Sequence, residues 1–296
     1  MDRVRSGRRA SMTHDELREL QTLYRRVGSD LAYAQSNISN ERVIDYLNDL
    51  VARGHALIYA PERKSPAAVL RELAHAAPLA LRRRMGYVGV AALITALGAG
   101  VGALAQSVDS SWMDAMVPGE LRQSIEIWQT GQFPEATGSE QFGFMAGLNL
   151  NNSWVAILML ASGLTFGLLT TYLLAINGMV LGVVIVEVGR VGQLGHLLSG
   201  IAAHGVPEFG AILIAGGGGL VLADALLRPG ELSRPDALRK AGPDCFWMIA
   251  FALLLLVVAA ILEAYVSHST LPRGMKVGIA GLLLVLLAGF VYGVRR

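Results

Sequence analysis

The chain has 296 residues, of which 53% are hydrophobic and only 16% are charged, with a mean hydropathy of +0.47. Soluble domains carry about 25% charged residues, so this composition argues against an ordinary soluble protein and predicts several membrane-spanning helices. The formal net charge of +2 is too small to indicate nucleic-acid binding. The single cysteine, Cys245, excludes an internal disulfide and a cysteine metal cluster.

A helical hairpin is expected near the N-terminus. Thr13 and Glu16 have the spacing of a capping box, in which each residue satisfies a backbone donor at the start of a helix. Apolar residues then recur at intervals of three and four along residues 17–31 and again along 43–57. With a turn at 37–40, the pattern predicts two antiparallel helices whose apolar faces pack on a third helix, bind a partner or meet a second copy.

The third helix is expected to begin at Ser65 and to lie along the membrane surface. Pro78 should kink or break it, because proline lacks the N–H that an interior helical position donates. We therefore predict a cytoplasmic domain over residues 1–84 that contacts the lipid headgroups through a run of arginines. These arginines are Arg82, Arg83 and Arg84.

Six apolar segments of about 20 residues are expected to cross the membrane, giving an all-α six-helix bundle over residues 85–296. Basic residues flank these segments on one side, which places both termini in the cytoplasm. The loop at 106–152 carries six acidic residues and only one arginine, so it is predicted to be external. The predicted crossings are residues 85–105, 153–174, 179–200, 205–226, 246–264 and 277–294.

Several asparagines are expected at the ends of crossings. Asn177 and the glycine after it are predicted to form a tight inner turn between the second and third crossings, because this pair tolerates left-handed backbone geometry. Asn149, Asn151 and Asn152 precede the second crossing and are predicted to cap it. The alternative is that these asparagines contact the polar residues of the fourth crossing.

That fourth crossing carries His204 and Glu208, which share one face of a helix at i, i+4. An ionisable group costs about 2.5–3.5 kcal/mol in the middle of a membrane, so such groups pair or have a function. The simplest interpretation is a polar contact that ties the helix to its neighbours; a proton or cation site and a metal site are the alternatives. Because no second pair of ligands is evident in the sequence, we predict no metal and no cofactor.

Two further acidic residues are candidates for polar sites near the outer surface. Glu187 is expected to pair with Arg190 at i, i+3. Glu263 lies near the outer end of the fifth crossing. Deeper in the membrane, the fourth crossing contains four consecutive glycines, which predict close helix packing or, alternatively, a hinge. They are Gly216, Gly217, Gly218 and Gly219.

Four patches, taken in order, resemble those of one family. They are the helical region 17–84 with its basic end, FGFMAGLNLNNSWVA at 142–156, INGMVLG at 176–182 and HGVPEFGAILIAGGGGLVL at 204–222. The chain resembles the stage II sporulation protein M family of bacterial membrane proteins. The last patch is the most specific, because polar residues and glycines at fixed places in a crossing rarely recur by chance.

The resemblance implies a membrane anchor. In spore formers the family member anchors two secreted peptidoglycan-degrading enzymes, and in other bacteria the genes often lie near those for a MoxR-type ATPase. We therefore expect a non-enzymatic scaffold of a cell-envelope complex in the bacterial plasma membrane. Its expected partners are the lipid bilayer, cell-wall hydrolases or a MoxR-type ATPase, and a second copy of the chain, with a dimer favoured. The alternative is a channel or transporter for protons, cations or a small solute, with its site around His204 and Glu208.

Overall fold

A computed structural model describes residues 13–38, 40–58, 65–117, 122, 138–267, 269 and 271–293. Over these residues the protein is helical throughout and contains no β-strand, which confirms the all-α prediction. The chain divides into two compact units, Met1–Pro66 and Ala67–Arg296. The sequence placed this boundary at residue 84, and the difference arises because the helix that follows Ser65 packs within the second unit.

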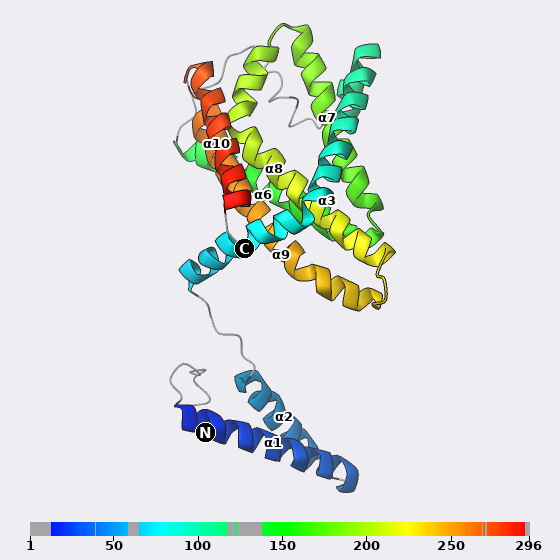
Figure 1. Ribbon diagram of the computed structural model, residues 1–296, viewed down its shortest axis with the longest axis vertical. Coiled ribbons are helices and arrows are strands. Elements are labelled where there is room, and N and C mark those ends of the chain that lie inside the picture. Colours follow the sequence, from blue (N-terminus) through cyan, green and yellow to red (C-terminus); the bar gives the residue numbers. More distant parts are fainter. Residues whose placement is uncertain are drawn as a thin grey trace. The chain divides into compact units, whose positions relative to one another are not determined.

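The first unit is a hairpin of α1 (His14–Asn37) and α2 (Glu41–Ile58) (Figure 1). The predicted capping box is present: Thr13 N–H donates to Glu16 Oε2 at 2.7 Å, and Glu16 N–H donates to Thr13 Oγ1 at 3.3 Å. The two helices contact each other through the ring of Tyr24, which lies against Gly54. The cytoplasmic location of this unit stays a prediction.

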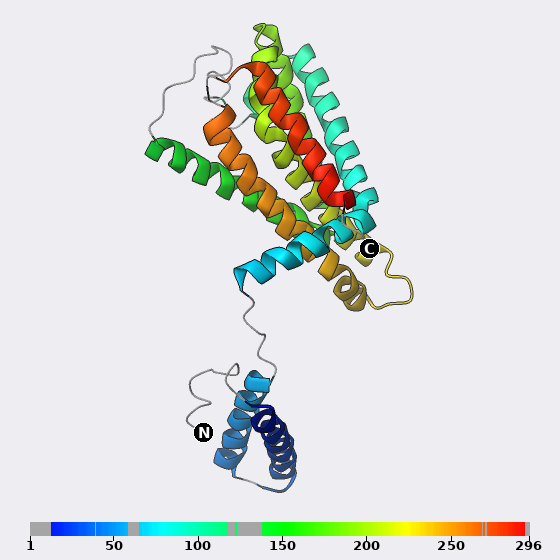
Figure 2. The ribbon, with the colours of Figure 1, turned by 60° about the vertical axis from the view of Figure 1, so that its left-hand side comes forward.

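The second unit, hereafter the membrane unit, is a bundle of long helices with short connecting elements (Figure 2). Its described elements are α3 (Pro66–Val108), α4 (Trp112–Met116), α6 (Gly138–Ala161), η3 (Ser162–Thr165), α7 (Leu168–Arg190), α8 (Leu194–Leu227), α9 (Arg234–Leu262), η4 (Glu263–Ser267) and α10 (Arg273–Gly293).

Helix α3 is one helix of 43 residues and is not divided at Pro78. The ribbon of α3 bends along its length (Figures 1 and 2). Pro78 lies inside the helix, where it cannot donate the usual backbone hydrogen bond. The first half of α3 is not only a surface element, because Leu73, Ala77 and Leu81 are buried in the main apolar core. Of the two effects predicted for Pro78, the break is wrong, because α3 is continuous through it.

The predicted turn at Asn177 is also wrong. The chain reverses earlier, at Phe166 and Gly167, which have left-handed φ values of 56° and 82°. Asn177 and Gly178 lie inside α7, and a Cβ at Gly178 would collide with the backbone of Thr95 in α3. The glycine at 178 is required for a close helix contact, whereas the left-handed turn uses Gly167.

These differences move the second and third predicted crossings. Residues 153–174 are divided between α6, η3 and the start of α7, and residues 179–200 are divided between α7 and α8. The predicted external loop is shorter, because α6 already begins at Gly138; residues 118–121 and 123–137 of that loop lie outside the described residues. Within the part of the chain that the structure describes, five helices are long and apolar enough to cross a membrane. They are α3, α7, α8, α9 with η4, and α10.

The helices of the membrane unit run in alternating directions around α8. Gly98 of α3 lies at Ala175 of α7 and Gly102 lies at Met179, so α3 and α7 are parallel. In the same way α6 runs parallel to α8, because Asn152 contacts Glu208 and Gly163 contacts Gly219. Since α3 and α7 run in the same direction, the segment between them returns along the bundle, and α6 is the described part of this return.

Candidate functional site

The centre of the membrane unit is formed by the glycine run of α8. All four glycines are buried, and α8 is a continuous α-helix through them. An added Cβ would lie 2.6 Å from Leu174 of α7 at Gly216, 2.9 Å from Val88 of α3 at Gly217, 2.8 Å from Leu160 of α6 at Gly218, and against the Met159 carbonyl of α6 at Gly219. Three neighbouring helices thus contact the α8 backbone directly, as close packing requires.

Three turns before the glycines, α8 carries its polar residues. His204 is buried, and its Nε2 lies 3.7 Å from Glu208 Oε2 one turn later. Glu208 Oε1 accepts a hydrogen bond of 2.8 Å from Asn152 Nδ2 of α6. The i, i+4 spacing therefore brings the two ionisable groups together, and Asn152 makes the contact that the sequence analysis offered as an alternative to capping.

A third ionisable group, Glu263, reaches the same place from η4. One ligand atom each of His204, Glu208 and Glu263 lies within 4.8 Å of the others. The element η4 is a turn of π-helix, in which each turn holds more residues than in an α-helix. Glu263 and Ser267, four residues apart, both face α8, and His204 Nδ1 lies 2.6 Å from Ser267 Oγ. We call His204, Glu208 and Glu263 the carboxylate–imidazole cluster.

The sequence did not place Glu263 in this cluster, because its position depends on how α9 packs on α8 and on the π turn. Lys276 of α10 was missed in the same way. Its side chain is buried, and its ammonium donates to the carbonyl oxygens of Ser267 at 2.7 Å and Ser269 at 2.9 Å. Ser267 is the last residue of the π turn, and its hydroxyl lies beside the His204 ring. Lys276 therefore holds this end of the turn in place.

The remaining asparagines do not join the cluster. The Asn149 side chain lies outside the described residues, and Asn151 is exposed, with its Nδ2 3.5 Å from Asn152 Oδ1. Asn177 donates to the Leu173 carbonyl within α7 at 2.8 Å. It also lines a mainly apolar cavity of about 220 Å³ between α3, α7 and α8.

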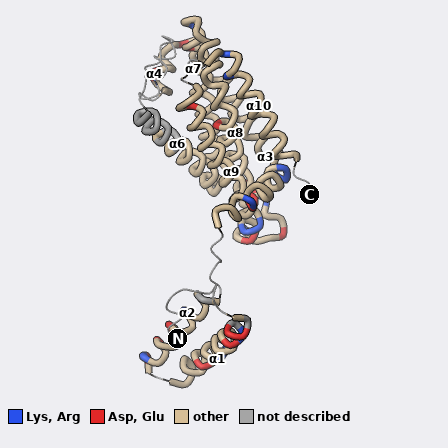
Figure 3. Tube along the Cα trace, turned by 90° about the vertical axis from the view of Figure 1, so that its left-hand side faces the viewer, with Lys and Arg blue, Asp and Glu red and all other residues tan. Residues whose placement is uncertain are grey.

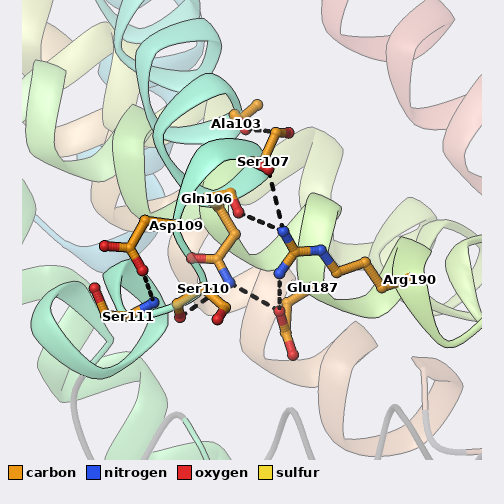
Figure 4. Close-up of polar contacts among 8 residues, drawn as sticks. All are labelled: Ala103, Gln106, Ser107, Asp109, Ser110, Ser111, Glu187 and Arg190. Atoms are coloured by element: carbon orange, nitrogen blue, oxygen red, sulfur yellow. Dashed lines mark hydrogen bonds and ion pairs between the residues drawn. The ribbon is translucent and has the colours of Figure 1, made fainter.

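A second polar cluster joins the ends of α3 and α7 (Figure 4). Glu187 accepts a hydrogen bond of 2.8 Å from Gln106 Nε2 and pairs with Arg190 at 3.4 Å, as its i, i+3 spacing predicted. Arg190 also donates to the Gln106 carbonyl at 2.6 Å. Beyond the helix end, the Ser111 N–H donates to Asp109 and holds the pKa of that carboxyl below its usual range. In this cluster a guanidinium balances the carboxylate within the membrane unit.

At the opposite end of the bundle, charged residues gather around the first half of α3 and the α8–α9 connection (Figure 3). Arg83 and Arg84 both bind Asp244 of α9, at 2.5 Å and 2.9 Å. The sequence assigned these arginines to lipid headgroups, but two of them hold α3 against α9. The headgroup contacts of Arg82, Arg83 and Arg84 stay a prediction.

Comparison with known proteins decides the family. The model of the stage II sporulation protein M family matches residues 90–268, which is more than half of the chain. The chain belongs to the stage II sporulation protein M family. The predicted resemblance is therefore confirmed, and with the apolar helices described above it makes the chain a multi-pass membrane protein. The carboxylate–imidazole cluster lies entirely within the part that matches this sporulation protein M family.

The chain is also similar to a second family and to an archaeal protein. A family described as a domain of unknown function (DUF8413) matches residues 2–60, which include the α1–α2 hairpin. The uncharacterized protein MJ0793 of Methanocaldococcus jannaschii is 32% identical over 136 residues, covering 43% of this chain and 72% of that protein. No solved structure gives a significant match.

Proposed function

We propose that this protein is a non-enzymatic anchor of a cell-envelope complex in the bacterial plasma membrane. The observation that supports it best is the glycine run of α8, where neighbouring helices contact the backbone of the central helix. Such packing fills the middle of the bundle with protein and favours a rigid body over an open path. Membership of the stage II sporulation protein M family agrees with a role at the cell envelope.

The proposal includes six crossings with both termini in the cytoplasm. The parallel direction of α3 and α7 supports it, because α6 then returns across the membrane between them. A test uses the variant Cys245→Ser, which removes the chain's only cysteine. A cysteine at Ser111 should react with an impermeant maleimide added to intact cells, and a cysteine at Glu231 should react only after permeabilisation. The reverse pattern would contradict this topology.

The α1–α2 hairpin is the proposed docking unit for a cytoplasmic partner, such as a MoxR-type ATPase, or for a second copy in a homodimer. It is a compact unit of its own and exposes large side chains, with Tyr33 66% and Tyr46 57% exposed. A chain that lacks residues 1–64 should stay in the membrane but lose a candidate ATPase in pairwise co-purification. The external segment between α4 and α6 is the proposed site for a cell-wall hydrolase, which the truncated chain should still bind. If both chains bind neither candidate, the anchor proposal fails.

The second candidate function is a pathway for protons or cations. The carboxylate–imidazole cluster favours it, because three ionisable groups lie together inside a membrane-spanning bundle. In liposomes, an anchor should show no proton or cation flux above that of empty vesicles. A flux that Glu208→Gln abolishes and Glu187→Gln retains would favour the pathway and contradict a purely structural role for this cluster.

A further inference from the structure

The carboxylate–imidazole cluster has an excess of negative charge. Two carboxylates and one imidazole share a space in which their ligand atoms lie within 4.8 Å. With both carboxylates ionised, the three groups carry a charge of −2 when the imidazole is neutral and −1 when it is protonated. Burying such a charge in a membrane-spanning segment is unfavourable unless a proton or a cation compensates it. A divalent cation neutralises both carboxylates at once.

The surroundings orient His204 as a ligand. Ser267 Oγ lies 3.4 Å from the Leu262 carbonyl, to which it donates, so its lone pairs are free to accept from His204 Nδ1 at 2.6 Å. With the proton on Nδ1, the lone pair of Nε2 is available to a metal ion on the side of Glu208, whose Oε2 lies 3.7 Å away. In metal-binding histidines, the N–H of the ring nitrogen that does not bind the metal commonly donates to a neighbouring oxygen. Asn152 similarly holds one oxygen of Glu208, and the other oxygen stays on the side of the imidazole.

The geometry requires only small side-chain movements. Two ligand atoms of a tetrahedral metal ion with bonds of about 2.1 Å lie about 3.4 Å apart. His204 Nε2 and Glu208 Oε2 are already 3.7 Å apart. The widest separation in the cluster, up to 4.8 Å, involves side chains whose terminal torsions can rotate. The π turn of η4 is an independent indication, because such turns in helices are frequent at functional sites.

We propose that His204, Glu208 and Glu263 bind one divalent transition-metal ion of the Zn²⁺ type, which joins α8 to η4. One nitrogen and two oxygen ligands suit Zn²⁺, whereas Mg²⁺ and Ca²⁺ prefer sites made of oxygen alone. Water completes the coordination. From the sequence only two candidate ligands, His204 and Glu208, could be placed together in α8. Glu263 of a separate helix supplies the third ligand. This inference goes beyond the anchor function and does not depend on any partner.

The test uses the full-length protein in nanodiscs, stripped with a chelator and then dialysed against Zn²⁺ or Co²⁺. Elemental analysis should give about one Zn²⁺ per chain, and Co²⁺ should produce the visible absorption of a four-coordinate site. A tenfold excess of Mg²⁺ should not displace either ion. Glu263→Gln keeps the size of the side chain and should weaken Zn²⁺ binding at least tenfold. His204→Gln should abolish the Co²⁺ absorption.

The matched control is Glu187→Gln, which alters a carboxylate of the second polar cluster and should leave Zn²⁺ binding unchanged. Each variant is compared by gel filtration, so that a misfolded chain is not mistaken for an unliganded one. The proposal is overturned if the wild-type protein binds less than a tenth of an equivalent of Zn²⁺ and shows no Co²⁺ absorption, a result that needs no variant. It is also overturned if folded Glu263→Gln and His204→Gln bind Zn²⁺ as tightly as the wild type.

Discussion

The two halves of α8 hold their neighbours by opposite means. In the first half, His204 contacts Ser267 of η4 at 2.6 Å and Glu208 binds Asn152 of α6 at 2.8 Å. In the second half, the glycines at 216–219 offer no side chain, and the neighbouring helices contact the backbone instead. One helix therefore provides both a polar region and a closely packed region.

This difference predicts different sensitivities. A polar contact depends on which atoms donate and accept, so an isosteric replacement can change its chemistry while its shape is preserved. A close contact at glycine depends on the absence of a side chain. Any side chain added there, polar or apolar, displaces the neighbouring helix. Isosteric changes in the first half should therefore alter polar contacts with little loss of stability, whereas side chains added in the second half should destabilise the fold.

The largest effect is expected for Gly219→Val. The new Cβ would meet the Met159 carbonyl and the side chain of Thr170, so we expect a loss of about 1–3 kcal/mol in the free energy of unfolding. Thermal melting in detergent micelles measures it. The control is Gly281→Val in α10, where a Cβ meets no atom within 4 Å. Equal melting temperatures for the two variants would contradict the packing described here.

A smaller effect is expected for Asn152→Leu in the polar half. It removes the donor to Glu208 and leaves a largely buried carboxylate oxygen unsatisfied, which costs about 1–2 kcal/mol. Asn151→Leu is the matched control, because the neighbouring amide is exposed. Unfolding in a graded denaturing detergent compares the two variants. If they lose the same stability, Asn152 does not tie α6 to α8.

The smallest effect is expected for Ser267→Ala, which removes the oxygen beside His204 Nδ1. A hydrogen bond within a membrane protein contributes about 0.6–1.5 kcal/mol, and the loss should fall in this range. Ser199→Ala serves as the comparison, since its hydroxyl donates only to the His196 carbonyl of its own helix. A loss for Ser199→Ala as large as that for Ser267→Ala would show that the contact between helices has no special weight.

Features within one helix could be predicted from the sequence. The capping box of Thr13 and the pairing of Glu187 with Arg190 follow from spacings of three or four residues, which fix which side chains meet in a helix. The number of long apolar segments likewise indicated a membrane bundle, because only helices that cross a lipid bilayer need such segments.

Features that depend on packing between helices could not be predicted. An asparagine followed by glycine suits a turn, but Asn177 bonds within α7 and Gly178 makes room for α3. The chain offers no local sign that Phe166, rather than either of these residues, takes a left-handed conformation. Similarly, Glu263 reaches His204 and Arg83 reaches Asp244 only because distant helices pack together.

The π turn at η4 has a consequence for how the family can diversify. A π turn holds one residue more than the α-helical turn it replaces, while the helix on its N-terminal side keeps its course. Removal of one residue between Glu263 and Ser267 would restore α-helical spacing and shorten the segment by about 1.5 Å, the rise of one residue in an α-helix. Glu263 and Ser267 would then be three residues apart, still on one face of the helix but at changed distances from His204. One in-frame codon gained or lost would thus change the spacing of this cluster between relatives without moving its residues to another helix.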